Sequence, residues 1–215
     1  MKKAAYILCS IIIPTLILSC EKTNTRKDVL KNREVYAGQY DSSLIYHEFD
    51  PPWELAFVWD NENIYGLGKD SMDIDSDKDF DIMISAFIIN PEKIDLIDFS
   101  QSAYPSYSIE LENNFSLAVC TELFPIGQGS VGTAEFVDTL NFGVRVDVLS
   151  AWSETLPFVD MWQSNPGFMA PSEGSWFHAG GIKYIGLKKD SKHGWIEVDA
   201  TDANHLKFTR FAVQK

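Results

Sequence analysis

The sequence has few cysteines and histidines, few basic residues, and no motif of a common enzyme active site. Its three cysteines and four histidines show neither the C-x-x-C nor the H-E-x-x-H spacing of zinc sites, and no G-x-S-x-G motif marks a hydrolase nucleophile. Only 18 lysines and arginines oppose 31 acidic residues, which gives a formal net charge of −13. A surface of this sign repels phosphate backbones, so we expect no nucleic acid partner.

Amphipathic helices are also missing, because no segment of about 11 or more residues repeats its apolar side chains at helical spacing. Short segments rich in β-branched and aromatic residues are instead separated by clusters of Asp, Asn, Gly, Pro and Ser. Residues 107–111 alternate apolar and polar side chains, whereas residues 82–89 are apolar on both faces apart from Ser85. The sequence therefore predicts an all-β fold, a two-layer antiparallel β-sandwich of jelly-roll-like type with residues 82–89 as a central strand.

The N-terminus has the build of a secretory signal. A basic start at Lys2 and Lys3 precedes an apolar run over residues 4–18, which is short for a bilayer span and contains a proline. The end of this run, Ile17-Leu18-Ser19-Cys20, resembles the lipobox of bacterial lipoproteins. The resemblance implies cleavage before Cys20 and a lipid on that cysteine. An ordinary signal peptide or a single anchor helix is the alternative interpretation.

Three parts of the chain follow from this interpretation. Residues 1–19 are the predicted lipoprotein signal peptide, residues 20–34 the lipidated N-terminus with a flexible tether, and residues 35–215 a single β-sandwich domain. The expected partner is a lipid bilayer, reached through the Cys20 anchor, because the acidic chain has no basic patch to bind one. Glu21 is not the aspartate that commonly holds lipoproteins at the inner membrane, which favours the outer membrane, on its periplasmic or surface face.

The C-terminal third resembles a recurrent ending of exported bacterial proteins. Its matching residues are Tyr184-Ile185-Gly186, then His193-Gly194-Trp195 after a charged loop, and Phe211-Ala212 in a last strand. This ending is frequent in uncharacterised lipoproteins and sorted surface proteins of Gram-negative bacteria of the Bacteroidetes type. The resemblance implies the closing strands of a β-sandwich and an exported location, and it implies no reaction. We expect Trp195 to lie in the core.

An acidic stretch places aspartates at alternate positions directly before the apolar residues 82–89. Its five candidate metal ligands are Asp73, Asp75, Asp77, Asp79 and Asp81. The stretch resembles the D-x-D-x-D-x-x-x-D calcium loops of EF-hands, dockerins and integrin-type β-propeller repeats. This resemblance implies side-chain oxygens from four aspartates and the backbone carbonyl of Asp79. Oxygen ligands at this spacing suit a hard cation, so we predict structural Ca²⁺ here, and the alternative is a solvated acidic turn.

Two residues depart from the EF-hand pattern. Lys78 stands where glycine normally makes the sharp turn, and Ile84 stands where an EF-hand has its bidentate glutamate. The propeller-type loop is the better comparison, because it runs straight into a strand and needs no twelfth residue. A single copy of the loop does not predict a propeller.

Residues 151–177 interrupt the strand pattern with a long, irregular, aromatic-rich segment. Trp152, Trp162 and Trp176 are candidates for stacking on a sugar ring or docking a partner, and the alternative is that they cover one sheet. We expect a membrane-anchored lipoprotein acting as a structural or ligand-binding module, with glycan as one ligand class. The rival hypothesis is a carbohydrate-active hydrolase that uses a carboxylate pair about 5–10 Å apart, although the sequence assigns no catalytic residue.

Overall fold

The structure is a computed structural model that describes most of the chain from Glu34 onward. The described residues are 34–90, 92–93, 106–125, 130–160, 164–165, 168–169, 176, 179–202 and 205–215. The predicted signal peptide (residues 1–19) and Cys20 lie outside the described residues. Among the residues that are described, no helix combines the length and apolar character needed to cross a bilayer. Val35–Lys215 forms one compact unit.

Strands dominate the described residues and form two main antiparallel sheets. The strands are β1 (Leu44–Glu54), β2 (Phe57–Trp59), β3 (Tyr65–Met72), β4 (Ile82–Ile89), β5 (Ser106–Leu111), β6 (Phe115–Pro125), β7 (Val131–Val137), β8 (Trp152–Ser153), β9 (Thr155–Asp160), β10 (Ser164–Asn165), β11 (Phe168–Met169), β12 (Ile182–Lys189), β13 (Lys192–Asp199) and β14 (Lys207–Gln214). One sheet has the order β2-β3-β4-β5-β9, and the other has the order β1-β14-β13-β12-β6-β7, with β8 paired to β6. The all-β sandwich prediction is confirmed, and β4 lies at the centre of its sheet as expected.

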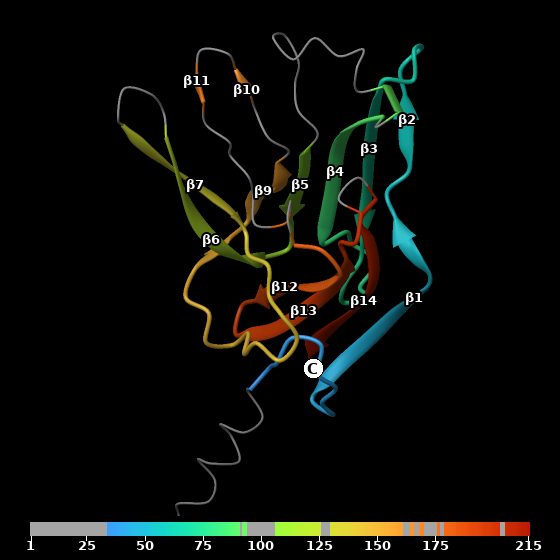
Figure 1. The fold of residues 1–215 in the computed structure, drawn as a ribbon. Helices are drawn as coiled ribbons and strands as arrows, with labels where there is room; N and C mark the ends of the chain where they lie inside the picture. The colour runs from blue at the N-terminus through green and yellow to red at the C-terminus, as the bar shows by residue number, and fades with distance from the viewer. Residues whose placement is uncertain are drawn as a thin grey trace, which may run out of the picture. The chain divides into compact units, whose positions relative to one another are not determined.

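The two sheets pack through the faces that their sequences make apolar. Strands β12 and β13 run across the direction of β3 and β4, so the sheets cross rather than align (Figure 1). Ile84 and Ile109 from the five-stranded sheet are fully buried in the same core as Ile185, Ile196 and Phe208 from the other sheet. Burying one such side chain contributes about 1.5–3 kcal/mol, so this shared core is the main source of stability.

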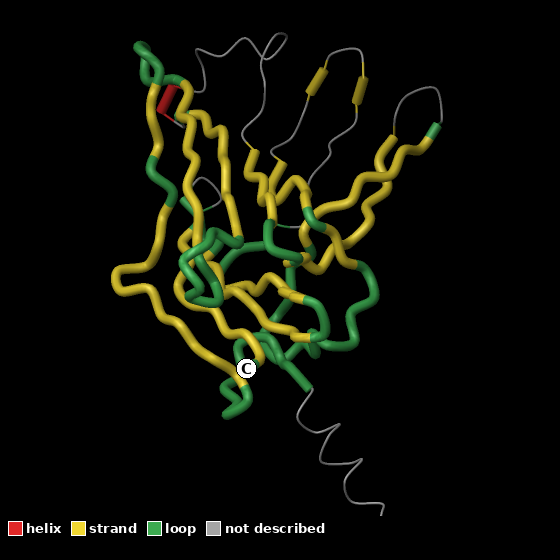
Figure 2. Tube along the Cα trace, turned by 180° about the vertical axis from the view of Figure 1, so that it is seen from behind, coloured by secondary structure: helices red, strands yellow, loops and turns green. Residues whose placement is uncertain are grey.

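The seven-stranded sheet is also covered on its outer side, by the loop segments 35–40 and 138–151 (Figure 2). A backbone hydrogen bond of 2.8 Å from the Ala37 N–H to the Val144 carbonyl joins the two segments. Trp195 lies between this cover and the sheet and is fully buried, as predicted. Strand β13 is therefore buried on both faces: Ile196 and Val198 lie in the core between the sheets, whereas Trp195 lies under the cover.

A carboxylate is buried in this second layer. Glu197 on β13 is only 7% exposed. It accepts hydrogen bonds from the Tyr184 hydroxyl (2.9 Å), the Thr209 hydroxyl (2.7 Å) and the Arg210 guanidinium (2.7 and 2.9 Å). Burial alone would raise the pKa of Glu197, but the bonds from Arg210, Thr209 and Tyr184 outweigh burial and hold the pKa below its ordinary value of 4.5.

We expect Glu197 to make the stability of the protein depend on pH. Because its pKa is lower in the folded chain than in the unfolded chain, its contribution is fully present above pH 4.5 and is lost as the pH falls through the folded pKa. Glu197→Gln should lower the free energy of unfolding by about 1–2 kcal/mol at neutral pH and by less in acid. Urea unfolding at pH 7 and at about pH 3.5 measures both values, and an equal loss at the two pH values would contradict the prediction.

Candidate metal centre

The acidic stretch forms the loop that joins β3 to β4. The Asp81 N–H donates to the Met72 carbonyl at 2.9 Å and closes the loop at its base. Ile74 is only 2% exposed and belongs to the core, so it anchors the loop from within. Ser76 and Lys78 adopt positive φ angles of 64° and 79°. The sharp turn that glycine makes in an EF-hand is thus made here by non-glycine residues, at some cost in backbone strain.

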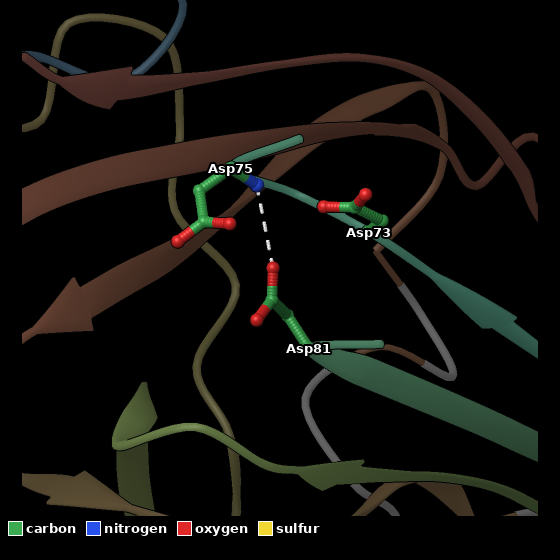
Figure 3. Close-up of side chains that lie close together, drawn as sticks. All are labelled: Asp73, Asp75 and Asp81. Carbon is green, nitrogen blue, oxygen red and sulfur yellow. Dashed lines mark hydrogen bonds between the residues drawn. The ribbon is translucent and has the colours of Figure 1, made fainter. Parts of the chain in front are cut away.

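Three of the five predicted ligands come together in this loop. One carboxylate oxygen from each of Asp73, Asp75 and Asp81 lies within 4.8 Å of the other two (Figure 3). We call these three residues the aspartate cluster. Asp77 and Asp79 lie outside it and are exposed; the Asp77 carboxylate instead accepts a hydrogen bond of 2.9 Å from the Asp79 N–H.

The loop backbone holds Asp73, the half-buried member of the aspartate cluster, in place. The two oxygens of Asp73 accept hydrogen bonds from the Ser76 N–H (2.7 Å) and the Lys78 N–H (2.9 Å). These bonds depend on the turn at Ser76 and Lys78, because that turn directs both N–H groups toward the carboxylate. Each oxygen keeps lone-pair capacity for a further partner.

The inner member, Asp81, is fully buried. Its Oδ2 accepts a hydrogen bond from the Asp75 N–H at 3.3 Å (Figure 3). Oδ2 also accepts one from the Ile74 N–H (2.8 Å), and Oδ1 accepts one from the Asn113 side chain (3.2 Å). The aspartate cluster could therefore hold a metal ion. Its all-oxygen donor set fits a hard cation such as Ca²⁺ and not a soft one.

A cationic side chain from the other sheet also reaches the aspartate cluster. The Nζ of Lys189, at the end of β12, lies 2.5 Å from Asp75 Oδ2. The same Nζ lies 4.6 Å from the centroid of the Phe115 ring, which β12–β6 pairing places opposite Lys189. The hydrogen bond from Lys189 is the main reason that the pKa of Asp75 lies below its ordinary value. Sequence reasoning missed Lys189, because 114 residues separate it from Asp75.

Two of the three tryptophans predicted as ligand-binding residues lie among the described residues, and the indole N–H of each is bonded to a backbone carbonyl. Trp176 is 1% exposed and its indole N–H donates to the Val137 carbonyl at 3.1 Å. The prediction for Trp176 is therefore corrected: it is a core residue and cannot stack on a ligand without leaving the core. Trp152 is half-buried, with its indole N–H bonded to the Leu149 carbonyl at 2.9 Å. Trp162 lies outside the described residues.

Two clefts in the described structure offer other places for a ligand. A groove of about 360 Å³ lies on the five-stranded sheet, and its lining includes Leu67, Lys69, Ser85, Phe87, Ser106 and Ser108. A polar cleft of about 440 Å³ lies near the ends of β1 and β13, lined by Glu54, Asp199, Thr201, Asp202, His205 and Lys207. The first combines apolar, hydroxyl and cationic groups, and the second brings three carboxylates to one cleft.

Comparisons of the chain with protein-family models, with curated proteins and with solved structures found no match. The residues described above therefore have to support any functional assignment by themselves.

Proposed function

We propose that the chain is an exported lipoprotein, held at a bilayer by a lipid on Cys20, whose β-sandwich is stabilised by Ca²⁺ at Asp73, Asp75 and Asp81. The observation that carries the calcium assignment is the convergence of three carboxylates at the base of one hairpin loop. The signal-like N-terminus and the lipobox-like sequence before Cys20 support the anchor. In this role the domain is a structural or ligand-binding module at the outer membrane.

Calcium suits the aspartate cluster and the proposed location. Ca²⁺ accepts six to eight oxygen ligands in flexible geometry, so water can complete the shell around three carboxylates. Extracellular modules commonly bind it with dissociation constants of roughly 10⁻⁴–10⁻³ M. Three carboxylates within 4.8 Å repel one another, and a bound divalent cation removes that repulsion.

Calcium should therefore raise the melting temperature of the lipid-free chain, residues 21–215. With about 5 mM Ca²⁺ and the affinity given above, the expected gain is about 1–2 kcal/mol of unfolding free energy, or about 3–6 °C. Melting curves with Ca²⁺ and with EDTA measure it, and a series in Mg²⁺ controls for general ionic effects. Identical curves in Ca²⁺ and EDTA would contradict the calcium site and leave a solvated acidic turn.

The anchor makes a separate prediction for the full chain. In a Gram-negative host, wild-type protein should sediment with membranes, whereas Cys20→Ser should lose the lipid and appear in the soluble fraction. One acyl chain alone gives marginal binding, whereas the diacyl and amide-linked chains of a lipoprotein cysteine together suffice for stable anchoring. Fractionation with radiolabelled palmitate measures both effects, and a labelled Cys20→Ser protein would contradict the assignment.

The polar cleft supports a second candidate function, a carbohydrate-active hydrolase. Its three carboxylates, on Glu54, Asp199 and Asp202, supply the residue type that glycosidases use as acid, base or nucleophile. Asp199 and Asp202 are the pair to test. Glu54 is paired with Lys207 at 3.0 Å, and the Asp199 carboxylate accepts hydrogen bonds from the N–H (3.0 Å) and the hydroxyl (2.6 Å) of Thr201. Release of reducing sugar from a polysaccharide panel, lost in Asp202→Asn, would favour the hydrolase; glycan binding without release would favour a binding module.

A further inference from the structure

Lys189 places a positive charge on the aspartate cluster from a different sheet. Its Nζ lies 2.5 Å from Asp75 Oδ2, and the charges of Asp81 and Asp77 also act on it. The loop holds the carboxylates and β12 supplies the ammonium group, so two elements far apart in the sequence meet here. The fold thus supplies a cation to a group of anions that would otherwise repel one another.

Lys189 and a divalent ion compete for the Asp75 carboxylate. A Ca²⁺ ion bonds carboxylate oxygens at about 2.3–2.6 Å, a distance close to the one that the ammonium already occupies on Asp75. Two cations that share one carboxylate repel each other strongly in a partly buried site. A calcium ion that bonds Asp75 Oδ2 therefore displaces the ammonium of Lys189, and one that bonds Oδ1 is repelled by it.

The Lys189 ammonium is also in contact with Phe115. The Phe115 ring centroid lies 4.6 Å from Nζ in the ion-paired position, so the cation–π contact and the ion pair with Asp75 are made together. The flexible four-carbon stem of lysine lets Nζ move away from Asp75 while the β12 backbone stays paired with β6. Displacement then requires a change of rotamer only.

We infer that Lys189 is a tethered counter-ion that competes with Ca²⁺ for Asp75 and so sets the calcium affinity of the aspartate cluster. This inference rests on the proposed calcium site. Lys189 stabilises the calcium-free protein by neutralising the cluster. It weakens calcium binding because an ion at Asp75 has to displace its ammonium group or bind against the repulsion of that charge. Removing its charge has opposite effects on these two quantities, whereas a purely structural residue would lower both.

Lys189→Gln tests the inference against a matched control, Lys188→Gln. Lys188 is the neighbouring residue on β12, and its Nζ lies 5.6 Å from the Trp152 ring centroid. Both variants change the net charge of the chain equally. Calcium titration calorimetry on residues 21–215 should show about three- to tenfold tighter binding in Lys189→Gln and no change in Lys188→Gln. In EDTA, Lys189→Gln should melt below the wild type.

The outcomes separate the inference from the calcium site itself. Equal calcium affinity in all three proteins would overturn the role of Lys189 and leave the site standing. Calcium binding by Lys189→Gln but not by the wild type would support the tethered counter-ion and overturn calcium as the native occupant. Absence of calcium binding in all three proteins would overturn both proposals. Lys189→Arg, which keeps the charge, should bind calcium no more tightly than the wild type.

Discussion

Gly194→Ala should lower the free energy of unfolding by about 3 kcal/mol or more, although alanine is the smallest possible addition. A Cβ atom at Gly194 would lie 2.3 Å from the Ala212 carbonyl oxygen and 3.1 Å from the Val213 Cα. Both atoms belong to the backbone of β14, which pairs with β13 inside the sheet, so no flexible side chain can move away. Urea unfolding measures this loss of stability. The close approach of the β14 backbone explains why the His193-Gly194-Trp195 segment has glycine at its centre.

Gly66→Ala is the control for this prediction. A Cβ atom there would lie 3.1 Å from the Ile88 Cγ1 and 3.2 Å from the Trp59 ring, which are side-chain atoms that can shift by a few tenths of an ångström. Its cost should be about 1 kcal/mol or less. Equal losses in the two variants would show that the backbone contact at Ala212 is not the cause.

Asp81→Ala should lower the free energy of unfolding by about 2–3 kcal/mol even in EDTA. The side chain is fully buried and accepts hydrogen bonds from the Ile74 N–H and the Asn113 amide. Without the Asp81 carboxylate, the Ile74 N–H loses the hydrogen bond that it donates to Oδ2. Ile74 then anchors the loop to the core less firmly. Urea unfolding in EDTA measures this effect separately from any bound metal.

Asp77→Ala is the matched control, because it removes the same charge from the same loop. Asp77 is exposed and lies outside the aspartate cluster, and its carboxylate accepts a hydrogen bond from the neighbouring Asp79 N–H. We expect a change within about 0.5 kcal/mol. A loss of stability as large as that of Asp81→Ala would mean that the stability depends on the number of charges in the loop and not on the buried hydrogen bonds of Asp81.

The strands could be predicted from the sequence because their periodicity is local. Residues 82–89 are apolar on both faces and form the central strand β4, although its outer face is only partly covered by described residues. Trp195 and Ile196 face opposite sides of β13, and each side is buried in its own cluster. The order of the strands could not be predicted, because it depends on which edges meet in space.

The site was predicted only in part, for a similar reason. The alternate spacing of aspartates identifies the loop but not which carboxylates turn inward, so Asp77 and Asp79 were included with the three residues that converge. Lys189 reaches the site only because β12 pairs with β6 beside it. Trp176 looked like a surface aromatic because its irregular segment has no period that would assign it to the core.

Calcium titration of residues 21–215 by calorimetry tests directly whether the aspartate cluster binds calcium. Asp73→Asn and Asp77→Asn serve as paired variants. We expect one site with a dissociation constant of roughly 10⁻⁴–10⁻³ M in the wild type. We expect at least about tenfold weaker calcium binding in Asp73→Asn, which loses a cluster carboxylate, and unchanged binding in Asp77→Asn. No calcium binding by the wild type, or equal weakening in the two variants, would contradict the site at Asp73, Asp75 and Asp81.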